Sequence, residues 1–162
     1  MLRSLSLIIA LLFTAECFSA DQPNCPITEN HIKAPSAGCL TLLDGHLLVI
    51  KAYNGKISIP GGSVDVAESA QCGAHRETWE ETGLHVRPQQ LLRVFDNGFH
   101  LFECLPPTES MLGDTLKPPF WLEIRQAFWL KPENFDQYTW RYPDQRHWLA
   151  EWIKDNGGAV SH

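Results

Sequence analysis

The sequence predicts a protein of the α+β class, folded as an α/β/α sandwich. Three observations lead to this expectation: several short strand-like segments, a proline-free helical segment at about residues 66–82, and an amphipathic helical segment at 144–155. The chain has 162 residues, which fits one domain. With 44% hydrophobic and 20% charged residues, it has the composition of an ordinary globular protein rather than of a disordered or fibrous one.

The first 20 residues have the features of a cleaved secretory signal. Arg3 supplies a positive charge, residues 5–13 are almost wholly apolar, and small residues follow. The apolar run is far shorter than the ~20 residues that a membrane-spanning helix needs. We therefore expect cleavage between Cys17 and Ala20 and a secreted or periplasmic protein. The alternative is an N-terminal helix that stays in the fold.

Four cysteines remain after residues 1–20 are removed. The shortened chain is predicted to consist of an arm at 21–36 and a domain at 37–158, and its cysteines are Cys25, Cys39, Cys72 and Cys104. An even number of cysteines in an exported chain predicts two disulfides. Three pairings are possible and the sequence does not choose among them. We favour Cys25–Cys39, which would attach the arm to the first strand and leave Cys72 with Cys104; four buried free thiols are the alternative.

The first predicted strands form a hairpin. Residues 37–43 and 46–52 are strand-like and flank Asp44-Gly45, a pair that a two-residue hairpin turn prefers. A short strand at 57–59 then leads into Pro60-Gly61-Gly62, which predicts a sharp turn of the backbone.

The central helix is predicted to end at Gly83, since glycine commonly follows the last helical residue. The rest of the chain is expected to contain strands at 91–95 and 99–104 joined by Asp96-Asn97-Gly98, a proline-rich loop at 105–119, a strand at 120–130, a connection at 131–142, and a helix at 144–155. One side of this last helix carries Trp148, Leu149, Trp152 and Ile153.

Negative charge is concentrated in one part of the chain. The formal net charge is −6, and residues 61–84 hold five acidic residues against one arginine, Arg76, so this stretch alone accounts for −4. Acid at this density repels polyanions unless a divalent cation covers it. The sequence therefore gives no support for nucleic-acid binding through a basic face.

Three of these acids share one face of the predicted helix. Glu77, Glu80 and Glu81 fall within an arc of about 100° at helical spacing. Like charges at this spacing destabilise a helix, and the helix dipole adds to the cost near its C-terminus. Carboxylate oxygens are hard ligands for Mg²⁺ or Mn²⁺, which would turn this repulsion into attraction. A solvated acidic face is the alternative explanation.

The spacing around the glutamates is more specific. From Gly62 the chain gives five residues, Glu68, seven residues, and then RETWEETGL from Arg76 to Leu84. This arrangement resembles the Nudix box, the motif of the Nudix hydrolase family, at every charged and glycine position. The preceding SIPGG at 58–62 is similar to the turn that leads into the box. Thr78 and Ile57 depart from the usual residue types without touching the charged positions.

The resemblance implies a fold, an activity and a set of roles. The fold is the family's sandwich, in which a mixed central sheet carries the box helix and a C-terminal helix. The activity is cleavage of a diphosphate linkage in a nucleoside diphosphate derivative, by attack of water on phosphorus with Mg²⁺ or Mn²⁺ as cofactor. The implied metal ligands are Glu77, Glu80, Glu81 and the carbonyl of Gly61. Arg76 would hold the carboxylates in place and pair with Glu68.

The residues of the reaction and of substrate binding are less fully specified. The candidates for the base that activates water are Glu80 first, Glu123 next and Glu133 beyond it. The candidates for contact with substrate are Trp140, Arg141 and Tyr142 before the last helix, with Phe99 and His100 as weaker ones. His75 is expected to be a residue of the helix face rather than a metal ligand, because its neighbours supply oxygen ligands.

Other functions are compatible with parts of this pattern. A diphosphate-bearing lipid or a sugar nucleotide of the cell envelope is an alternative substrate. A non-catalytic Nudix-like binding module is disfavoured because every ligand position is filled, and a carbohydrate-binding protein would use the tryptophans. We expect a small-molecule partner, no nucleic acid and no stable membrane span. The sequence does not predict the oligomeric state.

Overall fold

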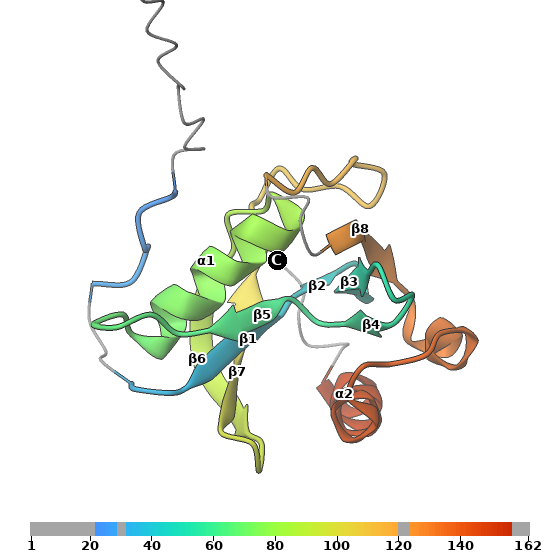
Figure 1. The fold of residues 1–162 in the computed structure, drawn as a ribbon. Coiled ribbons are helices and arrows are strands. Elements are labelled where there is room, and N and C mark those ends of the chain that lie inside the picture. The colour runs from blue at the N-terminus through green and yellow to red at the C-terminus, as the bar shows by residue number, and fades with distance from the viewer. Residues whose placement is uncertain (1–21, 29–31, 120–123, 157–162) are drawn as a thin grey trace, which may run out of the picture.

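A computed structural model describes residues 22–28, 32–119 and 124–156 (Figure 1). The predicted signal segment and its cleavage point lie outside the described residues. Among the described residues, no helix has the length and apolar character needed to cross a membrane.

Two four-stranded sheets form the centre of the molecule. The first sheet has the order β5 (Gly61–Ser63), β1 (Ser36–Leu40), β7 (Phe99–Leu105) and β6 (Arg87–Val94). In this sheet β1 and β7 run parallel, whereas β1–β5 and β6–β7 are antiparallel. The expectation of a mixed sheet is confirmed.

The second sheet is antiparallel and is built around β3 (His46–Ala52), which pairs with β2 (Leu42–Leu43), β4 (Ile57–Ser58) and β8 (Ile124–Leu130). The segment predicted as one strand at 37–43 is divided at Thr41, so that β1 belongs to the first sheet and β2 to the second. The predicted hairpin turn is confirmed, because Asp44 and Gly45 both have positive φ angles, 47° and 73°.

The central helix, α1 (Ala70–Thr82), begins four residues later than predicted. Ser69 is the N-cap, and its side chain accepts a hydrogen bond from the backbone N–H of Cys72 at 3.2 Å. The left-handed φ of Ala67, 70°, keeps the preceding residues out of the helix. The predicted end is confirmed, since Gly83 has a φ of 79° and its N–H donates to the Trp79 carbonyl at 2.8 Å.

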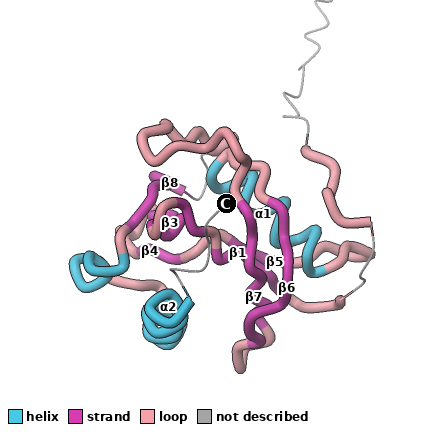
Figure 2. The backbone as a smooth tube through the Cα atoms, turned by 180° about the vertical axis from the view of Figure 1, so that it is seen from behind, coloured by secondary structure: helices cyan, strands magenta, loops and turns pink. Residues whose placement is uncertain are grey.

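The strands lie between two helices, as Figures 1 and 2 show from opposite sides. Residues that alternate along β1 and β7 point to opposite faces, and each face is covered by a different helix. On one face α1 packs in a cluster formed by Ala37, Cys39, Ala70, Ala74, Val86, Phe102 and Cys104. On the other, α2 (Pro143–Asn156) contributes Leu149 and Ile153 to a cluster that includes Leu40 and Leu101. The predicted α/β/α sandwich and the C-terminal helix are confirmed.

The predicted disulfides form, but their predicted pairing is wrong. Cys25 is bonded to Cys72 and Cys39 to Cys104, with Cα–Cα distances of 5.3 and 5.4 Å. Cys39 lies opposite Phe102 in the parallel β1–β7 pair, and Cys104 is two residues further along β7 on the same face. This long-range strand pairing brings Cys39 to Cys104, so the arm cysteine, Cys25, bonds to Cys72 in the first turn of α1.

Candidate active site

The turn before α1 is possible only with glycine. The φ of Gly61 is 151°, and a Cβ on this residue would lie 2.6 Å from the Ala37 carbonyl oxygen and from the Gly38 Cα. A Cβ on Gly62 would lie 2.4 Å from a carboxylate oxygen of Glu77. The two glycines therefore let β5 approach β1 and let the Glu77 carboxylate lie directly against the backbone.

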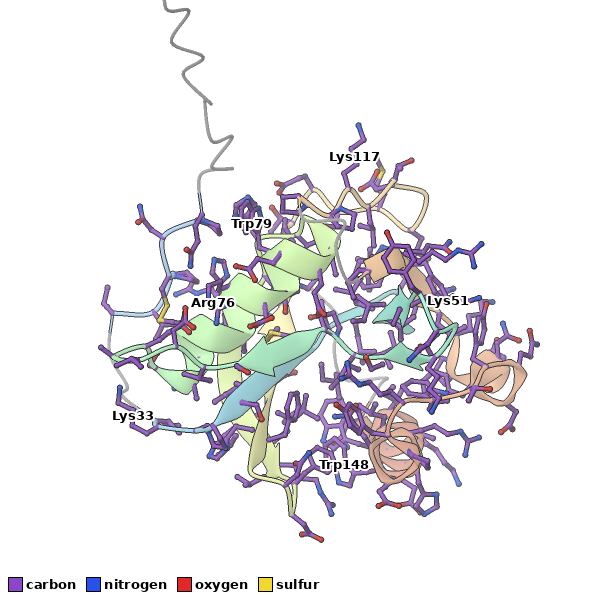
Figure 3. All side chains as sticks on the ribbon, viewed as in Figure 1. Lys33, Lys51, Arg76, Trp79, Lys117 and Trp148 are labelled. Atoms are coloured by element: carbon purple, nitrogen blue, oxygen red, sulfur yellow. A yellow bond between two sulfur atoms is a disulfide. The ribbon has the colours of Figure 1, made fainter. Side chains whose placement is uncertain are left out.

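Arg76 connects three parts of this region (Figure 3). Its Nε and one terminal nitrogen donate to the two carboxylate oxygens of Glu68 at 3.1 and 3.0 Å, and that terminal nitrogen also donates to the Ser63 carbonyl at 2.7 Å. Its other terminal nitrogen donates to Glu77 at 2.9 Å and to Glu80 at 3.3 Å. The predicted pairing with Glu68 is confirmed. The guanidinium ties the loop before the helix and strand β5 to the acidic face of α1.

All three glutamates of the helix line one cleft, together with Gly61 and Gly62. Arg76 holds Glu77 and Glu80, while Glu81 accepts a hydrogen bond from the Gly61 N–H at 2.9 Å. The predicted metal ligands are thus brought to the same place by the turn and by one face of the helix.

Burial makes negative charge costly in this cluster. Burial raises the pKa of the Glu77 carboxyl, and the hydrogen bond and charge of Arg76 offset this pKa shift only in part. Burial likewise raises the pKa of Glu80. For Arg76, burial opposes the charged form, but its hydrogen bonds to Glu68 and Glu77 outweigh burial and raise its pKa. Added positive charge beside Glu77 and Glu80 would favour their ionised forms.

The donor set suits a divalent cation, whereas the side-chain positions are those of a site without one. Carboxylates and a backbone carbonyl are the oxygen ligands that Mg²⁺ and Mn²⁺ prefer. Among the described residues, no three acidic, histidine or cysteine side chains converge as a metal site does. The carboxylates of Glu77 and Glu80 face Arg76, and that of Glu81 faces the Gly61 N–H. Cation binding therefore requires these carboxylates to turn from their present partners.

The cleft extends from the glutamates to the first turn of α2 and has a volume of about 950 Å³, within the range of small-molecule sites. Phe99, Arg141 and Tyr142, predicted to contact substrate, line it. The prediction for Trp140 is wrong. Its side chain is buried in the core, where the indole N–H donates to the Phe135 carbonyl at 3.1 Å.

Two arginines provide positive charge at the α2 end of the cleft. The Arg93 guanidinium lies 5.0 Å from the Phe95 ring centre and 5.6 Å from that of Trp148, and the Arg141 guanidinium lies 5.3 Å from the Tyr142 ring. Neither arginine has a salt bridge to a carboxylate in the described part of the chain. Their charges are available to an anionic ligand.

The backbone fixes Arg141 beside the acidic turn. The N–H of Arg141 donates to the Ile57 carbonyl at 2.8 Å, and the N–H of Ile57 donates to the Thr139 carbonyl at 2.9 Å. Since Ile57 belongs to β4, which leads directly to Gly61, the two ends of the cleft are connected through one short strand.

Sequence reasoning missed several cleft residues. These are Ser36, Ser63, Arg93, Phe95, Asp96, Asn97, Asp144 and Gln145. The tip at Asp96-Asn97-Gly98 was expected only as a turn. Of these residues, Gln145 had the clearest signal in the sequence. It precedes Leu149 and Ile153 by four and eight residues, so it is a polar residue on a helix face that is otherwise apolar.

The remaining predicted residues lie elsewhere. Glu133 is exposed and is not among the residues that line the cleft, so its geometry does not suit the base, and Glu123 lies outside the described residues. His75 is a buried residue of the helix, as expected; its Nδ1 donates to the Val86 carbonyl at 2.6 Å, and burial lowers its pKa. His100 does not line the cleft.

Comparisons with known proteins agree with this architecture. The sequence model of the NUDIX domain matches residues 32–152. A MutT-like protein of Streptomyces ambofaciens is 38% identical over 76 residues, which cover 43% of this chain and 49% of that protein. The chain thus matches about half the length of this curated relative.

Solved structures resemble most of the fold. An ADP-ribose pyrophosphatase from Streptococcus suis superimposes with a TM-score of 0.59 at 19% identity, covering 78% of this chain and 92% of that one. A Nudix hydrolase from Nitrosomonas europaea gives a TM-score of 0.61 at 19% identity, covering 79% and 75% of the two chains. At these identities, the likeness establishes the fold.

Proposed function

This chain belongs to the Nudix hydrolase family, and on that premise we propose that it hydrolyses the diphosphate linkage of a nucleoside diphosphate derivative with a bound divalent cation. Hydrolysis of a diphosphate is the activity of the family. The cation and the nucleoside substrate are our proposal for this chain.

One observation carries the proposal. The carboxylates of Glu77, Glu80 and Glu81 line the same cleft as the glycine turn, and two arginines without salt-bridge partners among the described residues line its other end. A diphosphate ester has negative charge that suits the arginines and oxygens that suit a cation held by the glutamates. A binding module without catalysis would not need three half-buried acids on one face.

The chain's own residues would act as follows. Glu77, Glu80, Glu81 and the Gly61 carbonyl would hold the cation, which neutralises diphosphate charge and increases the acidity of water when bound. Glu80, the more exposed of the two cleft acids that Arg76 contacts, would take the proton from the attacking water. Arg76 would keep the carboxylates oriented through its hydrogen bonds to Glu68 and Ser63.

A turnover screen tests this proposal. The oxidised full chain is incubated with Mg²⁺, with Mn²⁺ or with EDTA and with ADP-ribose, a nucleotide sugar, a dinucleotide or a prenyl diphosphate, and the phosphomonoester products are separated by chromatography and measured. We expect hydrolysis of nucleoside diphosphate derivatives that requires the metal. Glu80→Gln should lower kcat about 10²- to 10⁴-fold, the range contributed by a general base.

The control is the same substitution at an exposed acid. Glu151 lies on α2 outside the cleft, so Glu151→Gln should leave kcat unchanged. Turnover that persists in EDTA, or equal activity of the two variants, would refute the proposed role of the glutamates. Exclusive turnover of the prenyl diphosphate would refute the nucleoside substrate.

We also propose that the protein is exported. Two disulfides support this proposal, because structural disulfides persist mainly in oxidising compartments, and the apolar run near the N-terminus is of signal length. Mass spectrometry of the protein from its natural source should find a chain that begins between residues 18 and 21. An intact N-terminus on a cytoplasmic protein with reduced cysteines would contradict export.

A further inference from the structure

Gln145 occupies a position where packing alone would favour an apolar residue. The buried residues of α2 are Gln145, Leu149 and Ile153, which follow one another at intervals of four on one helix face. Leu149 and Ile153 belong to the hydrophobic core, whereas Gln145 lines the cleft. The apolar face of α2 thus carries a carboxamide at the point where this face meets the cleft.

The carboxamide oxygen of Gln145 has no hydrogen-bond partner in the part of the chain that the structure describes. The residue is only 6% exposed, so bulk water does not surround it. Buried polar groups in native proteins almost always have a partner, and an exception calls for an explanation. The residue lines the cleft, so rotation of the carboxamide about its last side-chain bond would present this oxygen to a ligand there.

The surroundings of Gln145 indicate the kind of ligand. Tyr142, one turn earlier, is 41% exposed and lines the cleft, and Phe95 and Phe99 line it as well, with ring centres 6.2 Å apart. Aromatic rings offer flat faces to another π system, and a carboxamide offers an acceptor and donors in one plane. Together these groups match a heterocyclic base, which has a flat face and an N–H on its edge.

We propose that Gln145 is a specificity-determining residue that accepts a hydrogen bond from the N–H edge of the substrate's nucleobase. This inference rests on the proposed diphosphate hydrolysis and adds the recognition of the group farthest from the reacting phosphates. Glutamine is a common partner of base edges, because its carboxamide matches neighbouring donor and acceptor atoms. A prenyl chain has no such donor, and a sugar hydroxyl has a donor without the flat face.

Matched substrates test the hydrogen bond. One pair is ADP-ribose and its analogue with unsubstituted purine, which lacks the amino group; the other is UDP-glucose and its N3-methyluracil analogue, which lacks the N–H. Of the two parent compounds, the one hydrolysed faster is used. The kcat/KM of the wild type should be about tenfold or more lower for its analogue, which lacks the donor. Gln145→Met, of similar shape, should show no difference within either pair.

The chain offers a control for the substitution. Gln71, in the first turn of α1, is also buried, at 3% exposed, and its carboxamide oxygen likewise has no partner among the described residues. It lines a separate cavity with Arg87 and Pro88, away from the main cleft. Gln71→Met should therefore keep the wild-type discrimination between the paired substrates.

The stability of the variants separates recognition from a structural role. Replacing an unpartnered buried amide by an apolar group of similar shape is neutral or stabilising, so Gln145→Met should not lower Tm. A lower Tm together with unchanged discrimination would overturn the inference in favour of a structural role. Discrimination that is absent in the wild type would overturn it as well.

The outcomes also distinguish this inference from the proposed function. Metal-dependent turnover in which removal of the base donor has no effect refutes only the role of Gln145. Absence of turnover with every diphosphate refutes the proposed function and this inference with it. Equal turnover of a base-free diphospho-sugar would show that the sugar, rather than the base, meets Gln145.

Discussion

The two ends of the cleft differ in how far the protein satisfies its own polar groups. At the α1 end, Arg76 and the Gly61 N–H donate to the glutamates of the helix, and the arginine makes five side-chain hydrogen bonds. At the α2 end, Arg93 and Arg141 have no salt bridges among the described residues, and the Gln145 oxygen has no partner there.

This difference separates a region whose polar groups are satisfied by the protein from one that leaves polar groups for a ligand. The α1 end holds its glutamates through the protein's own hydrogen bonds, and a cation would have to draw the carboxylates together from those partners. The α2 end leaves a buried amide oxygen unsatisfied, at a cost of about 1–3 kcal/mol, which a ligand can recover. Both disulfides of the described residues lie next to α1 rather than α2, since one bonds to α1 and the other lies beneath it, and neither lines the cleft.

Removal of the disulfides would test whether they stabilise α1 more than α2. Each of the double variants, Cys25→Ala with Cys72→Ala and Cys39→Ala with Cys104→Ala, should lose about 2–4 kcal/mol in free energy of unfolding. The loops they close, 47 and 65 residues, differ too little to separate them by chain entropy. Cys39 and Cys104 are both buried, so their replacement also leaves a cavity. The loss in free energy of unfolding should therefore be larger for this second variant.

Chemical denaturation gives these free energies, and amide hydrogen exchange locates the change. Under native conditions, exchange should quicken in α1 more than in α2 for both variants. Equal acceleration in the two helices would show that the disulfides stabilise the molecule as a whole and would remove this part of the contrast between the two ends.

Replacement of Arg76 would test how much its hydrogen bonds to the glutamates stabilise the α1 end of the cleft. Arg76→Met leaves the half-buried carboxylates of Glu68 and Glu77 without the guanidinium, and we expect a loss of about 3 kcal/mol in free energy of unfolding. Arg146→Met, which breaks an exposed ion pair with Asp136, should cost less than about 1 kcal/mol. Thermal and urea denaturation of the two variants measure the difference. A loss at Arg76 no greater than at Arg146 would contradict the account.

The same contrast explains what could be predicted from the sequence. The α1 end was predictable because its residues from Gly61 to Gly83 are contiguous, and helical spacing alone places Glu77, Glu80 and Glu81 on one face. The pattern also gave the pairing of Arg76 with Glu68. The helix start was mispredicted although Ser69 is of a type that commonly caps helices, because the absence of proline from residue 66 onward predicted an earlier start.

The α2 end comes from separate segments, so local patterns could not assemble it. Arg93 is on an edge strand, Arg141 is on a connection held by β4, and Gln145 is on a helix. Strand pairing brings them together, and it also determines which cysteines bond. Trp140 was wrongly predicted to contact substrate, because the sequence does not distinguish a buried indole from one in the cleft.

Replacement of an arginine at the α2 end would give a smaller effect. Arg141→Met should raise KM about tenfold for a diphosphate substrate with little change in kcat, because the lost contact to an anionic group is present both before and during the reaction. Arg125 is exposed on β8 and does not line the cleft, so Arg125→Met should leave both constants unchanged. Steady-state kinetics would measure them. A fall in kcat without a change in KM would place Arg141 in the reaction step instead.

The most direct test of the account is whether the glutamates bind a divalent cation. Mn²⁺ is titrated calorimetrically into the oxidised, metal-free full chain with a methylene-bridged diphosphate analogue, for the wild type and for a variant with Glu77→Gln, Glu80→Gln and Glu81→Gln. Circular dichroism establishes that both chains are folded. We expect saturable binding in the wild type and its loss in the variant. No binding to the wild type, or equal binding to both, would contradict the central claim.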